Sequence, residues 1–150
     1  MAGLREIIED FRRAAVTERE KGTYFEELVL CYLRNEATYR DYYNKVWRYA
    51  DWAEEQGLDK RDVGIDLVAQ TAGTNEFHAI QCKLYAEDHV IRKEDIDSFF
   101  TASGKRPFTH RIIVCSTNHW SEHAEEALRD QQIVQVSYLP DTRVAGVMLK

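Results

Sequence analysis

Residues 63–83 read VGIDLVAQTAGTNEFHAIQCK, the segment with the clearest strand pattern in the chain. Two strand-like runs, 66–70 and 76–83, flank residues 72–75, which are rich in turn formers, and this pattern predicts a β-hairpin. If the turn centres on Gly73 and Thr74, Asp66 lies opposite Gln81, with the two Cβ atoms about 5 Å apart. Lys83 shares a face with Gln81 because side chains alternate along a strand.

An aspartate, an amide and a lysine on one patch suggest metal chemistry. A carboxylate and an amide oxygen suit a hard cation such as Mg²⁺, for which Mn²⁺ could substitute. A neighbouring lysine could hold or help deprotonate an attacking water and stabilise charge on a phosphate. The alternative is a solvated hairpin face, against which the apolar neighbours count: Ile65, Leu67, Val68, Ala79 and Ile80.

Upstream of the hairpin, we expect two helices, over residues 4–20 and 23–34, from the spacing of their apolar residues. Glu26 lies at the edge of the apolar face of the second helix, whereas Glu27 points to solvent. Glu26 is therefore the carboxylate that could reach a buried site. The aromatic-rich segment 39–56 is either one helix or a short strand at 46–49 between two helical pieces, and the spacing leaves both open.

Downstream, the pattern predicts a helix at 93–103 ending at Gly104, an apolar strand at 111–116, a helix from Ser121 to about 131, and a strand at 133–138. This order of elements indicates an α/β domain with a mixed β-sheet and helices on both faces.

The composition describes a globular chain of 150 residues, one domain in size, with a net charge of −6. No apolar run is long enough for a membrane helix, and no signal peptide is visible. Three scattered cysteines read as free thiols in a reducing compartment, so we expect a cytoplasmic protein. The acidic balance counts against a simple nucleic-acid binder, but not against a nuclease whose grip on DNA lies in other domains.

The candidates for phosphate contacts are few. They are basic residues in or near loops and two serines of the helix at 93–103, and solvated surface is the alternative for each. The set is Lys60, Arg61, Lys93, Lys105, Ser98 and Ser103.

Three segments, GTYFEELV at 22–29, DVGIDLVA at 62–69 and AIQCK at 79–83, resemble the Mrr-type branch of the PD-(D/E)XK nucleases. Together with the later runs 95–103, 111–114 and 120–128, they are similar to the N-terminal nuclease domain of type ISP ATP-dependent restriction-modification enzymes. The resemblance implies a restriction endonuclease-like fold over residues 22–138, with a helical extension at 1–21 and a tail or linker at 139–150.

The resemblance also implies roles. Asp66 matches the metal-binding aspartate, Lys83 the motif lysine, and Glu26 the helix-borne acid that often completes the site. Gln81 stands where the wider superfamily usually has Glu or Asp, which removes one charge from the metal site. The implied cofactor is Mg²⁺, the implied substrate is double-stranded DNA, and helicase-like ATPase, methyltransferase and target-recognition domains are expected on the same polypeptide.

Three functions follow as hypotheses. The first is a metal-dependent DNA endonuclease domain with a site of Asp66, Gln81, Lys83 and Glu26. The second is a catalytically weak or inactive domain of the same fold that binds DNA or a partner, which Gln81 and the acidic charge favour. The third is a protein-interaction module that uses the aromatic segment 39–52.

Overall fold

The computed structural model describes residues 13, 17–59, 64–84, 89–116, 120–129, 134–138 and 148–149. Most of the helix predicted over residues 4–20 lies outside these ranges, as do Lys60 and Arg61. Within them, no helix is long and apolar enough to cross a membrane.

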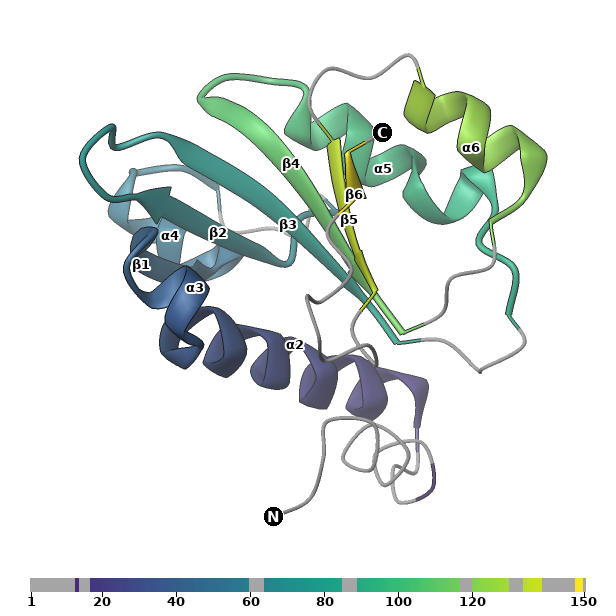
Figure 1. The fold of residues 1–150 in the computed structure, drawn as a ribbon, viewed down its shortest axis with the longest axis horizontal. Helices are drawn as coiled ribbons and strands as arrows, with labels where there is room; N and C mark the ends of the chain where they lie inside the picture. The colour runs from purple at the N-terminus through teal and green to yellow at the C-terminus, as the bar shows by residue number, and fades with distance from the viewer. Residues whose placement is uncertain are drawn as a thin grey trace.

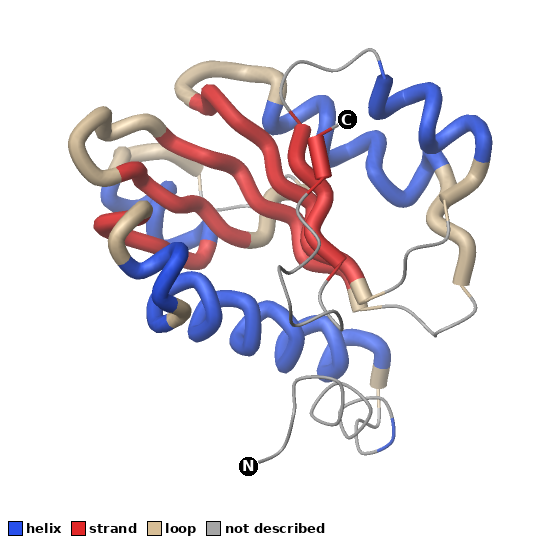
Figure 2. The backbone as a smooth tube through the Cα atoms, viewed as in Figure 1, coloured by secondary structure: helices blue, strands red, loops and turns tan. Residues whose placement is uncertain are grey.

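One mixed sheet forms the centre of the domain (Figures 1 and 2). Its strands follow chain order: β1 (Tyr43–Arg48), β2 (Leu67–Thr71), β3 (Phe77–Lys83), β4 (Phe108–Cys115), β5 (Val134–Tyr138) and β6 (Met148–Leu149). The β1–β2, β2–β3 and β5–β6 pairs are antiparallel, whereas β3–β4 and β4–β5 are parallel. The predicted α/β architecture with a mixed sheet is confirmed.

Helices cover both faces of the sheet, as Figure 1 shows. Helix α2 (Glu18–Asn35) packs on one face through Phe25, Val29 and Leu33, with short α3 (Ala37–Arg40) following it. Helices α4 (Tyr49–Glu55), α5 (Lys93–Ser103) and α6 (Glu122–Arg129) contribute to the core on the other face. Each face of the sheet therefore has its own apolar layer.

Strand β3 shows how its sequence serves both layers. Ile80 and Cys82 pack toward α2, while Ala79 belongs to the layer under α5 and α6. All residues from His78 to Cys82 are buried, as expected for a strand covered on both sides. The site residues at the end of β3 thus stand on a rigid central strand.

The hairpin forms in the predicted register. Leu67 pairs with Ile80 and Val68 with Ala79. The same register, extended by one residue, places Asp66 opposite Gln81. Gly73 and Asn75 adopt positive φ in the turn, as turn chemistry requires.

Segment 39–56 adopts the second of its two predicted forms, a strand between helical pieces, but the strand is longer than expected because β1 pairs with β2 from Tyr43 onward. Tyr43 and Trp52 are buried at 4% and 1% exposure, so these rings are core rather than a docking surface. Helix α2 begins earlier than predicted, where the Thr17 hydroxyl accepts a hydrogen bond from the Glu20 amide.

Candidate active site

Asp66 lies just before β2, and its backbone is held by two hydrogen bonds. Its amide donates to the Ile80 carbonyl (3.0 Å), and its carbonyl accepts from the Tyr49 amide (3.0 Å). The Asp66 Oδ2 atom accepts a hydrogen bond of 2.7 Å from the backbone N–H of Cys82. The carboxylate is therefore fixed over β3, between the positions of Gln81 and Lys83.

Gln81 is 3% exposed, and only one of the two polar atoms of its side-chain amide has a hydrogen-bond partner among the described residues. Its Nε2 donates to the Gly64 carbonyl at 3.2 Å, while its Oε1 is buried without a hydrogen-bond partner among the described residues. A buried acceptor left unsatisfied costs about 1–3 kcal/mol, so such an atom calls for a ligand or water. A cation beside Asp66 would satisfy it.

Gly64 sets the position of that carbonyl. Its φ is +94°, and a Cβ here would lie 2.9 Å from Ser98 Oγ and 3.0 Å from the Ser98 carbonyl carbon. Only glycine allows the loop to approach α5 so closely in this conformation. The exposed Ser98 therefore lies next to the loop that carries Asp66.

Glu26 and Arg48 meet at the edge of the site. Arg48 Nη1 lies 3.5 Å from Glu26 Oε1, and Arg48 Nη2 lies 2.9 Å from Glu27 Oε1. Arg48 ends β1 and pairs with Leu67, the residue after Asp66. The sequence reasoning missed Arg48; assigning residues 43–48 to a strand beside β2 would have found it.

The pKa of the buried Cys82 thiol depends on several charged side chains of the candidate site. Burial chiefly, with Asp66 and Glu26, raises the pKa of this thiol well above its ordinary value, while Arg48 and Lys83 lower it. All four charged side chains are thus close enough to act on one sulfur atom. The site combines two carboxylates with two cations.

Lys83 is the last residue of β3 and is half-buried. Its carbonyl accepts a hydrogen bond from the Ser116 amide at 3.1 Å, which ties this end of β3 to the end of β4. The fold places Asp66 opposite Gln81, with Lys83 on the same face of β3, and the ion pair of Glu26 and Arg48 acts on the same Cys82 thiol as Asp66 and Lys83.

The predicted phosphate contacts are more scattered. Lys93 lies at the start of α5 and pairs with Asp97 (3.2 Å), whereas the exposed Lys105 follows the other end of the helix. Ser103 is only 1% exposed, so the prediction that its hydroxyl contacts a phosphate is wrong for this conformation. Its side chain points into the core because it follows Phe99 and Phe100 on the buried side of α5.

A family model and a solved structure are similar to this chain. The family model Mrr_cat_2, described as a restriction endonuclease, matches residues 34–143, a range that includes Arg48, Asp66, Gln81 and Lys83 and begins after Glu26. No curated protein matches the chain.

The solved structure is described as an ATP-dependent Type ISP restriction-modification enzyme, LlaBIII, bound to DNA. The two chains are 26% identical with a TM-score of 0.69, over 95% of this chain and 10% of that enzyme. This chain therefore spans about a tenth of the length of LlaBIII. Because the family match extends over well more than half of its residues, the chain belongs to the Mrr-type restriction endonuclease family.

Proposed function

We propose that this chain is a DNA-cleaving module that hydrolyses phosphodiester bonds with the help of a divalent cation. One observation carries the proposal: Gln81 Oε1 is buried without a hydrogen-bond partner among the described residues, on the strand position that faces the fixed carboxylate of Asp66. The family to which the chain belongs supports it.

The donor set fits Mg²⁺, with Mn²⁺ as a substitute. Asp66 and Gln81 offer oxygen atoms, which hard cations prefer. Glu26 offers a third, provided that its ion pair with Arg48 opens. A bound cation would polarise a phosphoryl oxygen and lower the pKa of a water molecule.

The remaining side chains have electrostatic roles. The Lys83 ammonium, on the same strand face as Gln81, can orient a water and stabilise negative charge on the phosphate. Arg48 offsets part of the negative charge of Glu26 and Glu27 at the edge of the site, which lowers the repulsion that a DNA backbone would meet there.

Asp66→Asn is the sharpest test of this function. The Asn side-chain oxygen can still accept the hydrogen bond from the Cys82 amide, so the variant removes the charge and keeps the support. We expect the native chain to nick supercoiled plasmid with Mg²⁺ or Mn²⁺ and not with EDTA. Asp66→Asn should retain the fold, measured by circular dichroism, and lose nicking. Equal nicking by the variant would contradict the assignment.

A second candidate function is a domain that binds DNA or a partner without cutting. The neutral amide at Gln81 and the net charge of −6 favour it, because both weaken cation binding or DNA binding relative to an active nuclease. Metal-independent retention of DNA, with no nicking at any metal concentration, would support this candidate instead.

We also propose that the module works in the cytoplasm inside a larger restriction enzyme. LlaBIII is described as ATP-dependent, and this chain corresponds to a tenth of it. Helicase-like ATPase, methyltransferase and target-recognition domains on the same polypeptide would supply translocation and sequence choice. A longer native polypeptide that cleaves DNA only with ATP would support this arrangement.

A further inference from the structure

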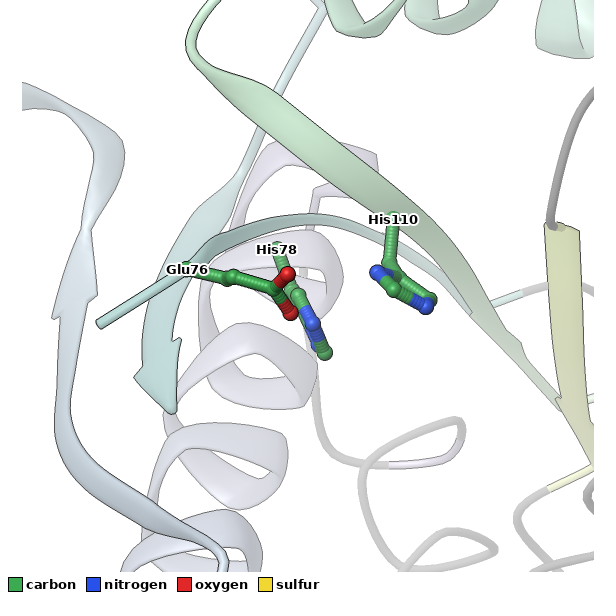
Figure 3. A group of neighbouring side chains, drawn as sticks. All are labelled: Glu76, His78 and His110. Carbon is green, nitrogen blue, oxygen red and sulfur yellow. The ribbon is translucent and has the colours of Figure 1, made fainter. Parts of the chain in front are cut away.

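Three metal-binding side chains gather at the start of β3, away from the candidate active site. Glu76 precedes β3, His78 lies on β3, and His110 lies on β4, where it pairs with His78 in the parallel ladder. One ligand atom from each residue lies within 4.8 Å of the other two. Figure 3 shows the Glu76 carboxylate beside the His78 ring, with the His110 ring on the same side of the neighbouring strand.

His78 is the buried member of the group, at 1% exposure. Its Nδ1 lies 2.8 Å from the hydroxyl of Tyr43, and its Nε2 is buried without a hydrogen-bond partner among the described residues. In His110, too, Nδ1 is the nitrogen next to a hydroxyl group, since it lies 3.2 Å from the Thr109 hydroxyl. In both rings, Nε2 is the nitrogen that remains for a ligand.

The hydrogen bond between His78 and Tyr43 suits metal binding. If His78 Nδ1–H donates to the Tyr43 oxygen, the lone pair is on Nε2. Metal-bound histidines are commonly held in this way, with the second nitrogen donating to a neighbouring oxygen.

We propose that Glu76, His78 and His110 form a binding site for a zinc-class transition metal, separate from the nuclease site. Two imidazoles and one carboxylate form a common zinc donor set with a fourth position for water, whereas Mg²⁺ prefers oxygen ligands alone. Zinc ligands at bond lengths of about 2.0–2.2 Å lie roughly 3.3 Å apart, so the group closes by a small side-chain rotation. Glu76 and His110 both reach solvent and can make it.

The two metal sites differ in position and face. His78 projects toward the α2 side with Ile80, and Gln81 lies three residues further along β3, about 10 Å away, with its side chain on the opposite face. A metal here would connect the β2–β3 turn to β4, so we expect it to stabilise the fold and not to take part in cleavage.

Zinc titration of the metal-free chain tests the proposal. Every protein carries Cys31→Ser, which removes the exposed thiol as a competing ligand. We expect one equivalent of Zn²⁺ to bind by calorimetry and to raise Tm, with excess Mg²⁺ unable to displace it. Asp66→Asn, at the proposed nuclease site, and His123→Asn, at an exposed position of α6, should bind zinc as the parent does.

Glu76→Gln and His110→Asn change the two side chains that reach solvent, so both variants should fold, which their metal-free Tm and circular dichroism check. We expect zinc affinity to fall about tenfold or more in each, and the zinc-induced rise in Tm to become smaller. Parental zinc affinity in both variants, loss of zinc binding in Asp66→Asn, or absence of stoichiometric binding in the parent would overturn the proposal.

Discussion

The Asp66 carboxylate both accepts a backbone hydrogen bond and is the proposed ligand of a cation. Its Oδ2 accepts a hydrogen bond from the Cys82 amide, so the side chain is already oriented for the metal that we propose it binds. Pre-organised ligands lose little freedom on binding, which favours a site that must work with one carboxylate and one amide. The same contact fixes Asp66, just before β2, against β3, which carries Gln81.

Lys83→Ala should reduce turnover far more than metal affinity. A protonated lysine has no lone pair for a cation, so the loss falls on the phosphate and the attacking water. We expect nicking to slow by about 10²–10³-fold, the usual effect of removing one group that stabilises developing charge. Calorimetry with Mn²⁺ should show affinity near that of the native chain, and Lys83→Arg should recover part of the rate. Loss of Mn²⁺ affinity as large as in Asp66→Asn would contradict this role.

Gln81→Glu should make the fold more dependent on metal. The native amide donates to the Gly64 carbonyl, whereas a glutamate would place a carboxylate oxygen against that carbonyl. We expect a lower Tm than native in EDTA, and a larger rise in Tm on adding Mg²⁺, because the added charge binds a hard cation more tightly. An unchanged response of Tm to Mg²⁺ would mean that position 81 does not contact the cation.

Alanine substitutions at three glycines of helices and loops distinguish the cost of backbone strain from the cost of steric overlap. Gly64→Ala meets both, because φ is +94° and Ser98 blocks the new Cβ, and we expect a loss of about 2–4 kcal/mol in the free energy of unfolding. Gly57→Ala meets strain alone (φ +72°, with nothing within 4 Å) and should cost about 1 kcal/mol. Gly22→Ala, inside α2 with open space around it, should gain about 0.5–1 kcal/mol.

Urea denaturation with a common slope ranks the three variants. Gly64→Ala should also lose nicking activity, because the Gly64 carbonyl supports Gln81. A Gly64→Ala chain as stable as Gly57→Ala would show that α5 shifts easily and does not hold the loop.

The elements also explain what the sequence could predict. The hairpin of β2 and β3 was predicted in register because a short turn couples neighbouring residues and alternation selects the buried face. The site of Asp66, Gln81 and Lys83 follows from that register alone. The sequence alone does not decide the structure of residues 43–48, because their aromatic residues fit both a helical and an extended spacing; their pairing with β2 makes them a strand.

Arg48 and the His78–His110 pair depend on contacts between distant segments. Arg48 lies near the candidate site because β1 pairs with β2. His110 lies beside His78 because β3 and β4 pair in parallel, although α5 stands between these two strands in the sequence. The register of a parallel pair has no short turn to fix it, so the sequence shows two separate histidines and not a cluster. Burial of Ser103 was missed for a related reason: one polar residue on an apolar helix face gives no signal of its own.

At the scale of the whole molecule, charge limits what the chain can do alone. It carries 26 acidic and 20 basic side chains, a balance that repels a DNA duplex at long range. In the part of the chain that is described, Lys93 and Lys105 lie at opposite ends of α5, roughly 16 Å apart along an 11-residue helix. Lys93 is also paired with Asp97, so these two residues do not form one continuous basic patch.

We therefore expect the isolated chain to bind DNA weakly, with a Kd of about 10⁻⁴ M or higher at physiological salt, and to nick it slowly and without sequence preference. Tethering to a DNA-translocating partner should raise the nicking rate steeply, because local concentration replaces intrinsic affinity. Gel-shift titration and plasmid nicking, with and without a fused translocase, measure both effects. A tethered Asp66→Asn chain controls for contaminating nuclease. Tight, sequence-specific binding by these 150 residues alone would instead mean that the module carries its own recognition surface.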